Sequence, residues 1–183
     1  SDLLLNGEEG LSFLSIPGAK EVGIEFNSLS KTYNLTGMRV SFALGNRDVI
    51  ARFRAFRSQI DYGMFYPIQA GAVAALTGPQ DIVRRNREGY MARRDALCGG
   101  LRRIGWDVPD AQGTMFVWAK IPAHFASSVD FALELMEKTG VICVPGSSFG
   151  QQGEGYVRFA LVVPPERMEE AVRRIDESGI LKG

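Results

Sequence analysis

Cysteine and histidine are scarce in this sequence, and their scarcity excludes several kinds of site. The 183 residues include two cysteines, Cys98 and Cys143, and one histidine, His124. The cysteines lie far apart, form no CxxC pair and have no histidine nearby. We therefore expect neither a zinc site nor a disulfide scaffold. The low cysteine content fits a protein of a reducing compartment. A hydrolase triad would have to use His124, which lies two residues after Pro122 in a predicted surface loop, so we set that class aside.

An excess of charge of either sign is also absent. The 21 basic residues balance 21 acidic ones, so the chain lacks the basic footprint of a protein that binds nucleic acid or anionic membranes, and neither is expected as a partner. No run of about 18 apolar residues predicts a transmembrane helix, and residues 1–6 do not resemble a signal peptide. The composition, 45% apolar and 23% charged, is typical of a globular protein, and we predict a cytoplasmic one.

The hydrophobic pattern predicts a mixed α/β chain in which strands and helices alternate. Residues 1–20 and 27–38 carry loop signals. The predicted strands are 22–26, 39–45, 114–119, 141–144 and 156–163. The predicted helices follow Asn46, cover 67–77, run from about 80 to 104, lie between Ser127 and Gly140, and follow Pro164. The pattern indicates a division near residues 78–80, with the long helix beginning the second domain.

One lysine stands apart from the charged helical faces. Lys31 lies in a predicted loop among the hydroxyl groups of Ser28, Ser30 and Thr32, and Arg39 follows eight residues later. If the loop folds back, Arg39 and the serine hydroxyls could converge on one anion. Phosphate is bound by hydroxyl donors and planar arginine, and a lysine amine can attack an aldehyde. Pyridoxal phosphate carries both groups. The alternative is a solvent-exposed lysine near a structural arginine.

The segment around Lys31 resembles the Schiff-base lysine motif of fold-type I, class I/II aminotransferases. Its pattern, Ser-x-Ser-Lys-Thr-Tyr-Asn followed by Gly, a bulky residue and Arg, is similar to the LL-diaminopimelate aminotransferase-like branch. The resemblance continues in order along the chain and implies the fold of pyridoxal-phosphate-dependent transferases. The further segments that carry it are 15–22, 69–76, 112–118, 140–150 and 155–161.

The resemblance implies a role for each site residue. Lys31 is the catalytic residue that forms the Schiff base with pyridoxal 5′-phosphate. Ser28, Ser30 and Arg39 bind the cofactor phosphate. Arg158 binds the α-carboxylate of the substrate, for which the alternative is a structural salt bridge within a strand.

Four other residues of these segments depart from the family pattern or support it. Tyr66 occupies a position where relatives often carry asparagine near the substrate. This departure gives Tyr66 a role in substrate specificity as a hypothesis and puts diaminopimelate as the substrate in doubt. Tyr33 and Asn34 are supporting residues or have no role. Met38 replaces a usual tryptophan, from which we expect only a packing difference.

The resemblance also implies which part of the family's full-length protein this chain corresponds to. The family's aspartate on the pyridine nitrogen belongs to a region that would precede Ser1, so we expect this chain to be a C-terminal half that is inactive alone. Residues 1–78 would be the C-terminal portion of the large cofactor-binding domain, ending its sheet. Residues 79–183 would be the small α/β sandwich domain. By analogy with the family, the whole protein is expected to be a homodimer.

Three functions remain open from the sequence. The first is an aminotransferase that exchanges amino and keto groups between an amino acid and a 2-oxo acid. The second is a C–S lyase of the same fold, which would use the same lysine and phosphate site for β-elimination. The third is a non-catalytic regulatory module built on an aminotransferase-like domain.

Overall fold

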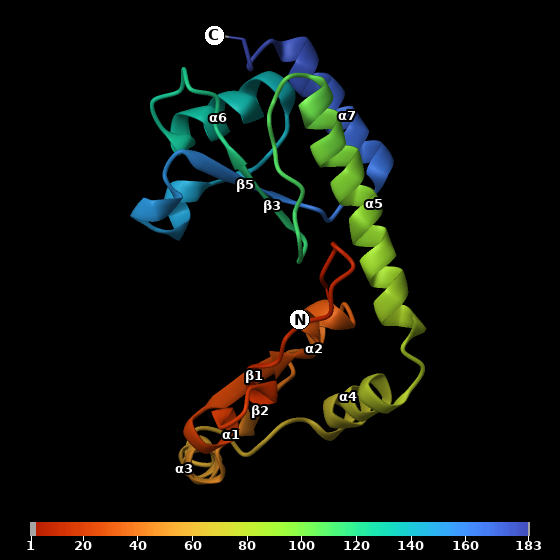
Figure 1. The fold of residues 1–183 in the computed structure, drawn as a ribbon, viewed down its shortest axis with the longest axis vertical. Helices are drawn as coiled ribbons and strands as arrows, with labels where there is room; N and C mark the ends of the chain where they lie inside the picture. The colour runs from red at the N-terminus through yellow and green to blue at the C-terminus, as the bar shows by residue number, and fades with distance from the viewer. Residues whose placement is uncertain (1–2, 183) are drawn as a thin grey trace. The chain divides into compact units, whose positions relative to one another are not determined.

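The structure is a computed structural model that describes residues 3–182, and the chain divides into two compact units (Figure 1). Unit 1 comprises residues 1–87 and unit 2 comprises residues 88–183. The long helix α5 (Asp81–Arg103) begins in unit 1 and continues into unit 2. The two units are described separately below.

Unit 1 is built around a two-stranded antiparallel sheet. Strands β1 and β2 pair in a register that places Ser28 opposite Ser41 and Ile24 opposite Gly45. The segment that connects the two strands carries Lys31, so the sheet holds both ends of that segment. The elements in order are η1 (Phe13–Ser15), α1 (Ala19–Val22), β1 (Ile24–Ser28), α2 (Leu29–Thr32), η2 (Thr36–Met38), β2 (Ser41–Gly45), α3 (Arg47–Arg57) and α4 (Tyr66–Thr77).

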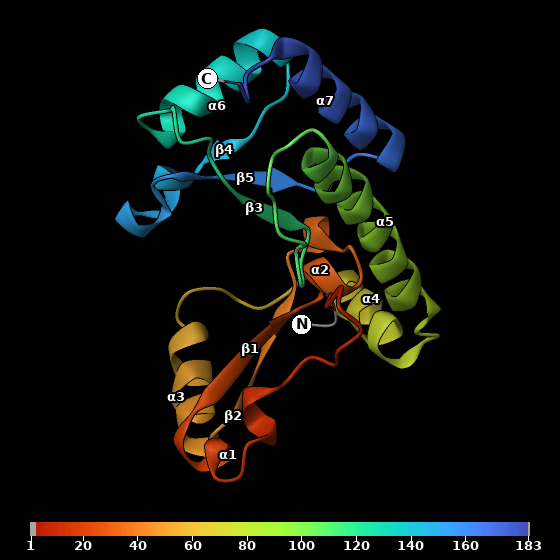
Figure 2. The ribbon, with the colours of Figure 1, turned by 45° about the horizontal axis from the view of Figure 1, so that its top comes forward.

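Unit 2 is an antiparallel three-stranded sheet with order β3-β5-β4, packed against helices. Arg158 on β5 lies opposite Trp118 on β3 and opposite Val144 on β4. The elements after α5 are β3 (Phe116–Lys120), α6 (Ser128–Thr139), β4 (Val144–Pro145), η3 (Gly146–Phe149), η4 (Gln151–Gly153), β5 (Tyr156–Ala160) and α7 (Pro165–Ser178). Figure 2 shows α6 and α7 beside each other on one side of this sheet.

Alternation along the strands gives the sheet of unit 2 a buried and a partly exposed face. On β3 and β5 the buried side chains are Val117, Ala119, Val157 and Phe159. They share the core with buried helical residues, namely Leu97, Leu101, Phe131, Leu135, Val172 and Ile175. The opposite face presents Phe116, Trp118 and Arg158, none of which is buried.

Side-chain caps begin two of the helices where the sequence predicts them. The Asn46 side chain accepts hydrogen bonds from the amides of Asp48 and Val49, both at 3.0 Å, at the start of α3. The Ser127 hydroxyl accepts from the Asp130 amide at 3.1 Å at the start of α6. Both capping predictions are therefore confirmed.

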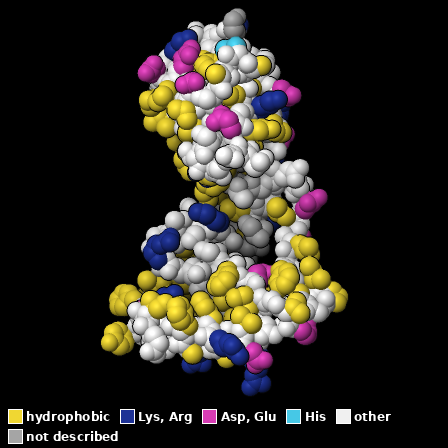
Figure 3. Space-filling view, turned by 90° about the vertical axis from the view of Figure 1, so that its left-hand side faces the viewer, with side chains coloured by type: hydrophobic (Ala, Val, Ile, Leu, Met, Phe, Trp, Pro, Cys, Tyr) yellow, Lys and Arg dark blue, Asp and Glu magenta, His cyan; other side chains and the backbone are white. Residues whose placement is uncertain are grey.

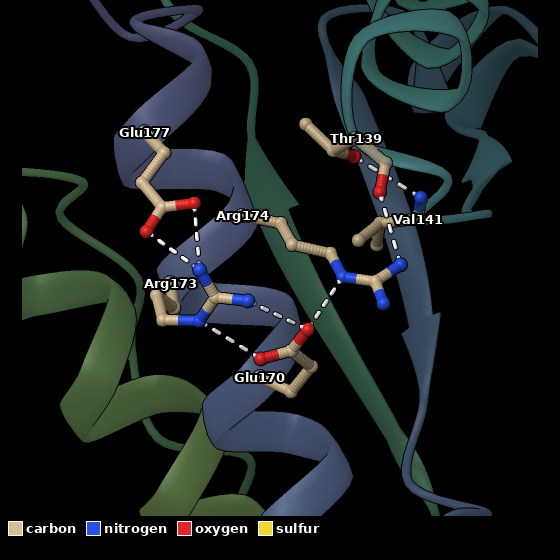
Figure 4. Close-up of polar contacts among 6 residues, drawn as sticks. All are labelled: Thr139, Val141, Glu170, Arg173, Arg174 and Glu177. Carbon is tan, nitrogen blue, oxygen red and sulfur yellow. Dashed lines mark hydrogen bonds and ion pairs between the residues drawn. The ribbon is translucent and has the colours of Figure 1, made fainter.

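An ion-pair network runs along α7 and reaches the end of α6 (Figure 4). Glu170 accepts hydrogen bonds from Arg173 and Arg174, each as short as 2.8 Å, and Arg173 also pairs with Glu177. Arg174 extends further to the carbonyl oxygen of Thr139 at 3.5 Å. These arginine bonds hold the pKa of Glu170 below its ordinary value. The network therefore joins the turns of α7 and connects this helix with α6.

The observed elements differ from the predicted ones in several places. The predicted strand 22–26 is shifted, because Val22 ends α1 and β1 covers Ile24–Ser28. Segments 1–20 and 27–38, predicted as loops, contain the short helical elements η1, α1, α2 and η2. The predicted strand 141–144 shrinks to β4, because only Val144 and Pro145 pair with β5. The predicted strand 156–163 ends at Ala160.

Large apolar side chains are exposed on unit 1, and Figure 3 shows apolar groups gathered over the lower part of that view, where unit 1 lies. The exposed residues include Leu11, Val22, Phe26, Phe56, Ile60, Tyr62, Phe65, Tyr66 and Val73. Within residues 3–182 no helix is long and apolar enough to cross a membrane.

Candidate active site

The loop after β1 turns at a pair of serines. Ser28 ends β1 with extended backbone and caps the four-residue helix α2, accepting a hydrogen bond from the Ser30 amide at 3.2 Å. The Ser28 hydroxyl also lies 3.0 Å from the Ser30 hydroxyl and 3.4 Å from the Val40 carbonyl oxygen. The structure therefore brings together two hydroxyl groups predicted to bind phosphate.

Lys31 and Arg39 are cations without a carboxylate partner. Lys31 lies in α2 between buried Ser30 and buried Thr32, and its own side chain is exposed. Arg39 donates to the Thr36 carbonyl oxygen at 3.1 Å. Across residues 3–182, no acidic side chain forms an ion pair with either. Their charges are thus available to an anion.

Two residues with left-handed backbone bracket the turn between Lys31 and Arg39. Asn34 has φ 56° and Arg39 has φ 53°, a region that non-glycine residues rarely adopt. Hydrogen bonds hold this turn in place, because Thr36 donates to the Ser30 carbonyl oxygen at 3.1 Å and Asn86 donates to that of Thr32 at 3.1 Å. Strained backbone of this kind clusters at ligand sites.

The neighbours of this loop have contacts of different kinds. The Tyr33 hydroxyl donates to the Gln80 side chain at 2.8 Å, which is a structural role. A Cβ on Gly71 of α4 would lie 2.6 Å from the Met38 methyl carbon, so Met38 packs closely on α4. Tyr66 begins α4 with 78% of its side chain exposed, and no hydrogen bond or ring contact joins it to the Lys31 loop within the described residues.

Arg158 on β5 is enclosed by aromatic rings. Its guanidinium carbon lies 4.1 Å from the centroid of the Phe116 ring and 4.4 Å from that of Phe149. Its side chain forms no ion pair or hydrogen bond with any residue between 3 and 182. The guanidinium therefore keeps an uncompensated charge, unlike Arg102, which pairs with Asp110 at 2.8 Å.

The segment that carries Phe149 is fixed by a close backbone crossing. A Cβ on Gly146 would lie 1.9 Å from the Gly153 oxygen, and a Cβ on Gly153 would lie 2.1 Å from the Gly146 oxygen. Only glycine fits at either position. Glu154 adds hydrogen bonds from the amides of Ser128 at 2.6 Å and Gly155 at 2.8 Å. These amide donors hold the pKa of Glu154 below its ordinary value of 4.5.

The residue pattern by itself assigns no role to Phe116 or Phe149. It predicts a mobile turn near the substrate, or a plain surface loop, for the glycine-rich run 146–155, which contains the two crossing glycines. The signal was present in part, because Phe116 and Trp118 alternate with buried Val117 and so share a sheet face with Arg158. Phe149 comes from a loop, and no periodicity places its ring beside β5.

Comparisons with known proteins agree along nearly the whole chain. Residues 9–175 match the family described as aminotransferase class I and II. LL-diaminopimelate aminotransferase from Halothermothrix orenii is 46% identical over 180 residues, which cover 98% of this chain and 46% of that protein. The chain thus spans about half the length of the curated relatives that it matches.

Solved structures of the same family have the same fold. A probable N-succinyldiaminopimelate aminotransferase from Thermus thermophilus is 36% identical with a TM-score of 0.87, over 97% of this chain and 47% of that one. An aromatic aminotransferase from Pyrococcus horikoshii is 28% identical with a TM-score of 0.91, over 97% and 48%. These matches confirm the predicted α/β fold of pyridoxal-phosphate-dependent transferases, and with it the predicted cofactor. The chain belongs to the class I and II aminotransferase family.

Proposed function

We propose that this chain forms part of a pyridoxal-phosphate-dependent aminotransferase, which exchanges amino and keto groups between an amino acid and a 2-oxo acid. The observation that carries the proposal is the segment from Ser28 to Arg39. It holds two hydroxyl groups 3.0 Å apart, an exposed lysine one residue after the second serine, and an arginine that has no carboxylate partner among residues 3–182. The match of residues 9–175 to the aminotransferase family supports it.

The donors of this loop fit the phosphate group of the cofactor. Ser28 and Ser30 supply hydroxyl groups 3.0 Å apart, and Arg39 supplies a guanidinium bonded only to a neutral carbonyl oxygen. Hydrogen bonds from hydroxyls and guanidinium to a phosphate are charge-assisted and stronger than those between neutral groups. We assign Ser28, Ser30 and Arg39 to the cofactor phosphate.

Lys31 is assigned to covalent and proton-transfer chemistry. Bound pyridoxal phosphate supplies an aldehyde that reacts with amines and a ring that accepts electrons from the substrate's α-carbon. Lys31 is exposed, and no acidic side chain among residues 3–182 forms an ion pair with its Nζ. We assign it to attachment of the cofactor and to carrying the proton removed from that α-carbon.

Arg158 and Tyr66 are assigned to the substrate. The uncompensated guanidinium of Arg158 suits a carboxylate, which it can bind through two parallel hydrogen bonds. Tyr66 is the residue that we assign to discrimination among amino-acid side chains, because its ring is exposed and forms no hydrogen bond among residues 3–182. Because the Halothermothrix orenii relative is named an LL-diaminopimelate aminotransferase, LL-diaminopimelate is the first amino donor to assay.

We further propose a cytoplasmic homodimer for the whole protein, and no transamination by the 183 residues alone. The apolar side chains exposed on unit 1 support contact with further protein. The span of about half the relatives' length supports the inactivity of the chain by itself.

The test is an assay of amino transfer with nitrogen-labelled donor. The chain is assayed alone and fused to the part of the Halothermothrix orenii relative that it does not match. We expect label to pass to 2-oxoglutarate from at least one amino acid of a panel that begins with LL-diaminopimelate in the fused protein, and not in the chain alone or in the fused Lys31→Ala variant.

The same samples distinguish the lyase. A C–S lyase would release pyruvate and ammonia from a sulfur amino acid without any 2-oxo acid acceptor. Such release, with no label transferred to an acceptor over a panel of amino acids, would contradict the proposed function.

A further inference from the structure

The aromatic surroundings of Arg158 are more than packing. Among residues 3–182, several arginines form ion pairs with carboxylates, as Arg57, Arg102 and Arg173 do. Arg158 instead has the Phe116 centroid at 4.1 Å and the Phe149 centroid at 4.4 Å. Among residues 3–182 no aromatic ring pair joins Phe116 and Phe149, so each ring makes its own contact with the guanidinium.

This arrangement limits how the guanidinium can lie. A planar cation is attracted to the face of an aromatic ring, and two ring contacts restrict rotation of the guanidinium more than one would. The N–H donors of guanidinium project from its edge in the fork that matches a carboxylate. Rings that stack on the faces of the guanidinium would leave that edge available to a carboxylate.

Each ring is itself held. Phe116 lies in β3, and β3 is paired with β5 over residues 116–120. Phe149 ends η3 and contacts the Trp118 ring edge to face at 5.6 Å, and Trp118 stacks on Tyr156 at 5.7 Å with an interplanar angle of 18°. The Gly146–Gly153 crossing and the Glu154 hydrogen bonds fix the loop on which Phe149 stands.

We propose that Phe116 and Phe149 are positioning residues, whose rings hold the Arg158 guanidinium so that its edge meets the substrate carboxylate. This inference rests on the proposed function only for the identity of the anion. The rings orient a cation that would otherwise sample many rotamers, and they do so without neutralising it. An acidic partner would orient the arginine as well, but it would compete with the carboxylate of the substrate.

The test follows the Arg158 side chain directly, in the 183-residue chain and without cofactor. Arginine Nε–Hε signals are recorded by NMR, and the Arg158→Lys variant assigns the signal of Arg158. Protons above an aromatic face resonate upfield, so we expect an upfield Arg158 signal in the wild type. It should move downfield in Phe149→Leu and return in Phe149→Tyr. Phe149 is 49% exposed, so leucine leaves the core intact.

The second readout is the affinity for 2-oxoglutarate, titrated on the same signal. We expect Phe149→Leu and Phe116→Leu each to weaken binding about twofold to fivefold, the range typical of one cation–π contact at a partly exposed site. Phe125→Leu is the matched control. Phe125 lies in the same unit and contacts Phe131 at 5.0 Å, with no contact to Arg158.

The outcomes separate the two proposals. Binding of 2-oxoglutarate at Arg158 that is equally strong in the wild type and both leucine variants, with an unmoved Nε–Hε signal, would overturn the positioning role alone. An upfield signal that responds to Phe149→Leu, with no response to 2-oxoglutarate in either the chain alone or the fused protein, would refute the substrate role of Arg158, and the positioning role with it.

Discussion

Single residues carry the chemistry of this chain through charges left without a counter-ion. Among residues 3–182, Lys31 is exposed without an ion pair, Arg39 donates to a carbonyl oxygen, and Arg158 contacts aromatic rings. Surface ion pairs elsewhere, such as Arg57–Asp61 and Lys138–Glu134, contribute at most modestly to stability. An unpaired cation can bind an anion, and for Lys31, Arg39 and Arg158 the hydroxyl pair, the loop and the aromatic rings near them in the fold or the sequence add to that charge.

The cysteines give a prediction at this scale. Burial raises the pKa of the Cys143 thiol to about 12 and also raises that of Cys98. The thiolate is the reactive form, so neither residue should react with iodoacetamide in the folded chain at pH 8. Mass spectrometry should find both modified after unfolding in urea. Rapid modification of Cys143 in the folded chain would contradict its burial.

Two glycines of α5 give a matched pair of predictions at the scale of the element. A Cβ on Gly100 would lie 2.7 Å from a Val172 methyl group, whereas a Cβ on Gly89 meets nothing within 4 Å. Gly100→Ala should destabilise the chain by about 1–3 kcal/mol through overpacking. Gly89→Ala should stabilise it by about 0.5–1 kcal/mol, because alanine favours the helix.

Urea unfolding of both glycine variants is the measurement. The opposite signs are the essential result, since both substitutions add the same methyl group to the same helix. Equal effects of the two would mean that α7 does not pack against α5 at Val172.

The loop between β4 and β5 should respond to pH through Glu154. Its pKa is lowered by the amides of Gly155 and Ser128, so its stabilising effect is present above its ordinary pKa of 4.5 and is lost as the pH falls through the lowered value. Glu154→Gln should therefore destabilise the chain at pH 7, and this destabilisation should shrink as the pH falls below 4.5.

Thermal unfolding at several pH values tests this linkage. Glu137→Gln is the control, because Glu137 is exposed on α6 and makes no hydrogen bond or ion pair with residues 3–182. A Glu154→Gln effect that stays constant from pH 7 to pH 3 would show that the carboxylate charge is not involved.

Helix starts were predictable because their signals are local. Asn46 and Ser127 cap α3 and α6 from within one turn, and Pro165 begins α7. The shortness of β4 was not predictable, because its length depends on which residues of β5 pair with it. The helix α2 was missed because its only local signal, the Ser28 cap, lies among residues that also favour turns.

The candidate site was likewise predictable where its residues are close together in the sequence, and not where they come together through the fold. Ser28, Ser30, Lys31 and Arg39 lie in one segment of the sequence, so their chemistry could be inferred together. The aromatic surroundings of Arg158 depend on the β3–β5 register and on the fold of the 146–155 loop. No spacing in the sequence contains that information, and the role of Tyr66 stays a prediction.

At the scale of the whole molecule, the exposed apolar surface of unit 1 leads to a prediction about association. Residues such as Val22, Phe26 and Phe56 are 80%, 62% and 66% exposed, and apolar surface of this kind favours contact with other protein. We expect the 183 residues alone to self-associate with rising concentration in sedimentation velocity. A monodisperse monomer that unfolds cooperatively would contradict this expectation.

The most direct test of the central claim is to map where pyridoxal phosphate attaches. The chain is incubated with the cofactor, alone and as the fusion described above, reduced with borohydride and digested for peptide mapping. Lys20→Ala is the matched control, since Lys20 is also an exposed lysine of unit 1. We predict a visible absorbance band and an adduct at Lys31, both lost in Lys31→Ala and kept in Lys20→Ala. Adducts spread evenly over the lysines of both proteins, with a spectrum unchanged by Lys31→Ala, would contradict a cofactor site at Lys31.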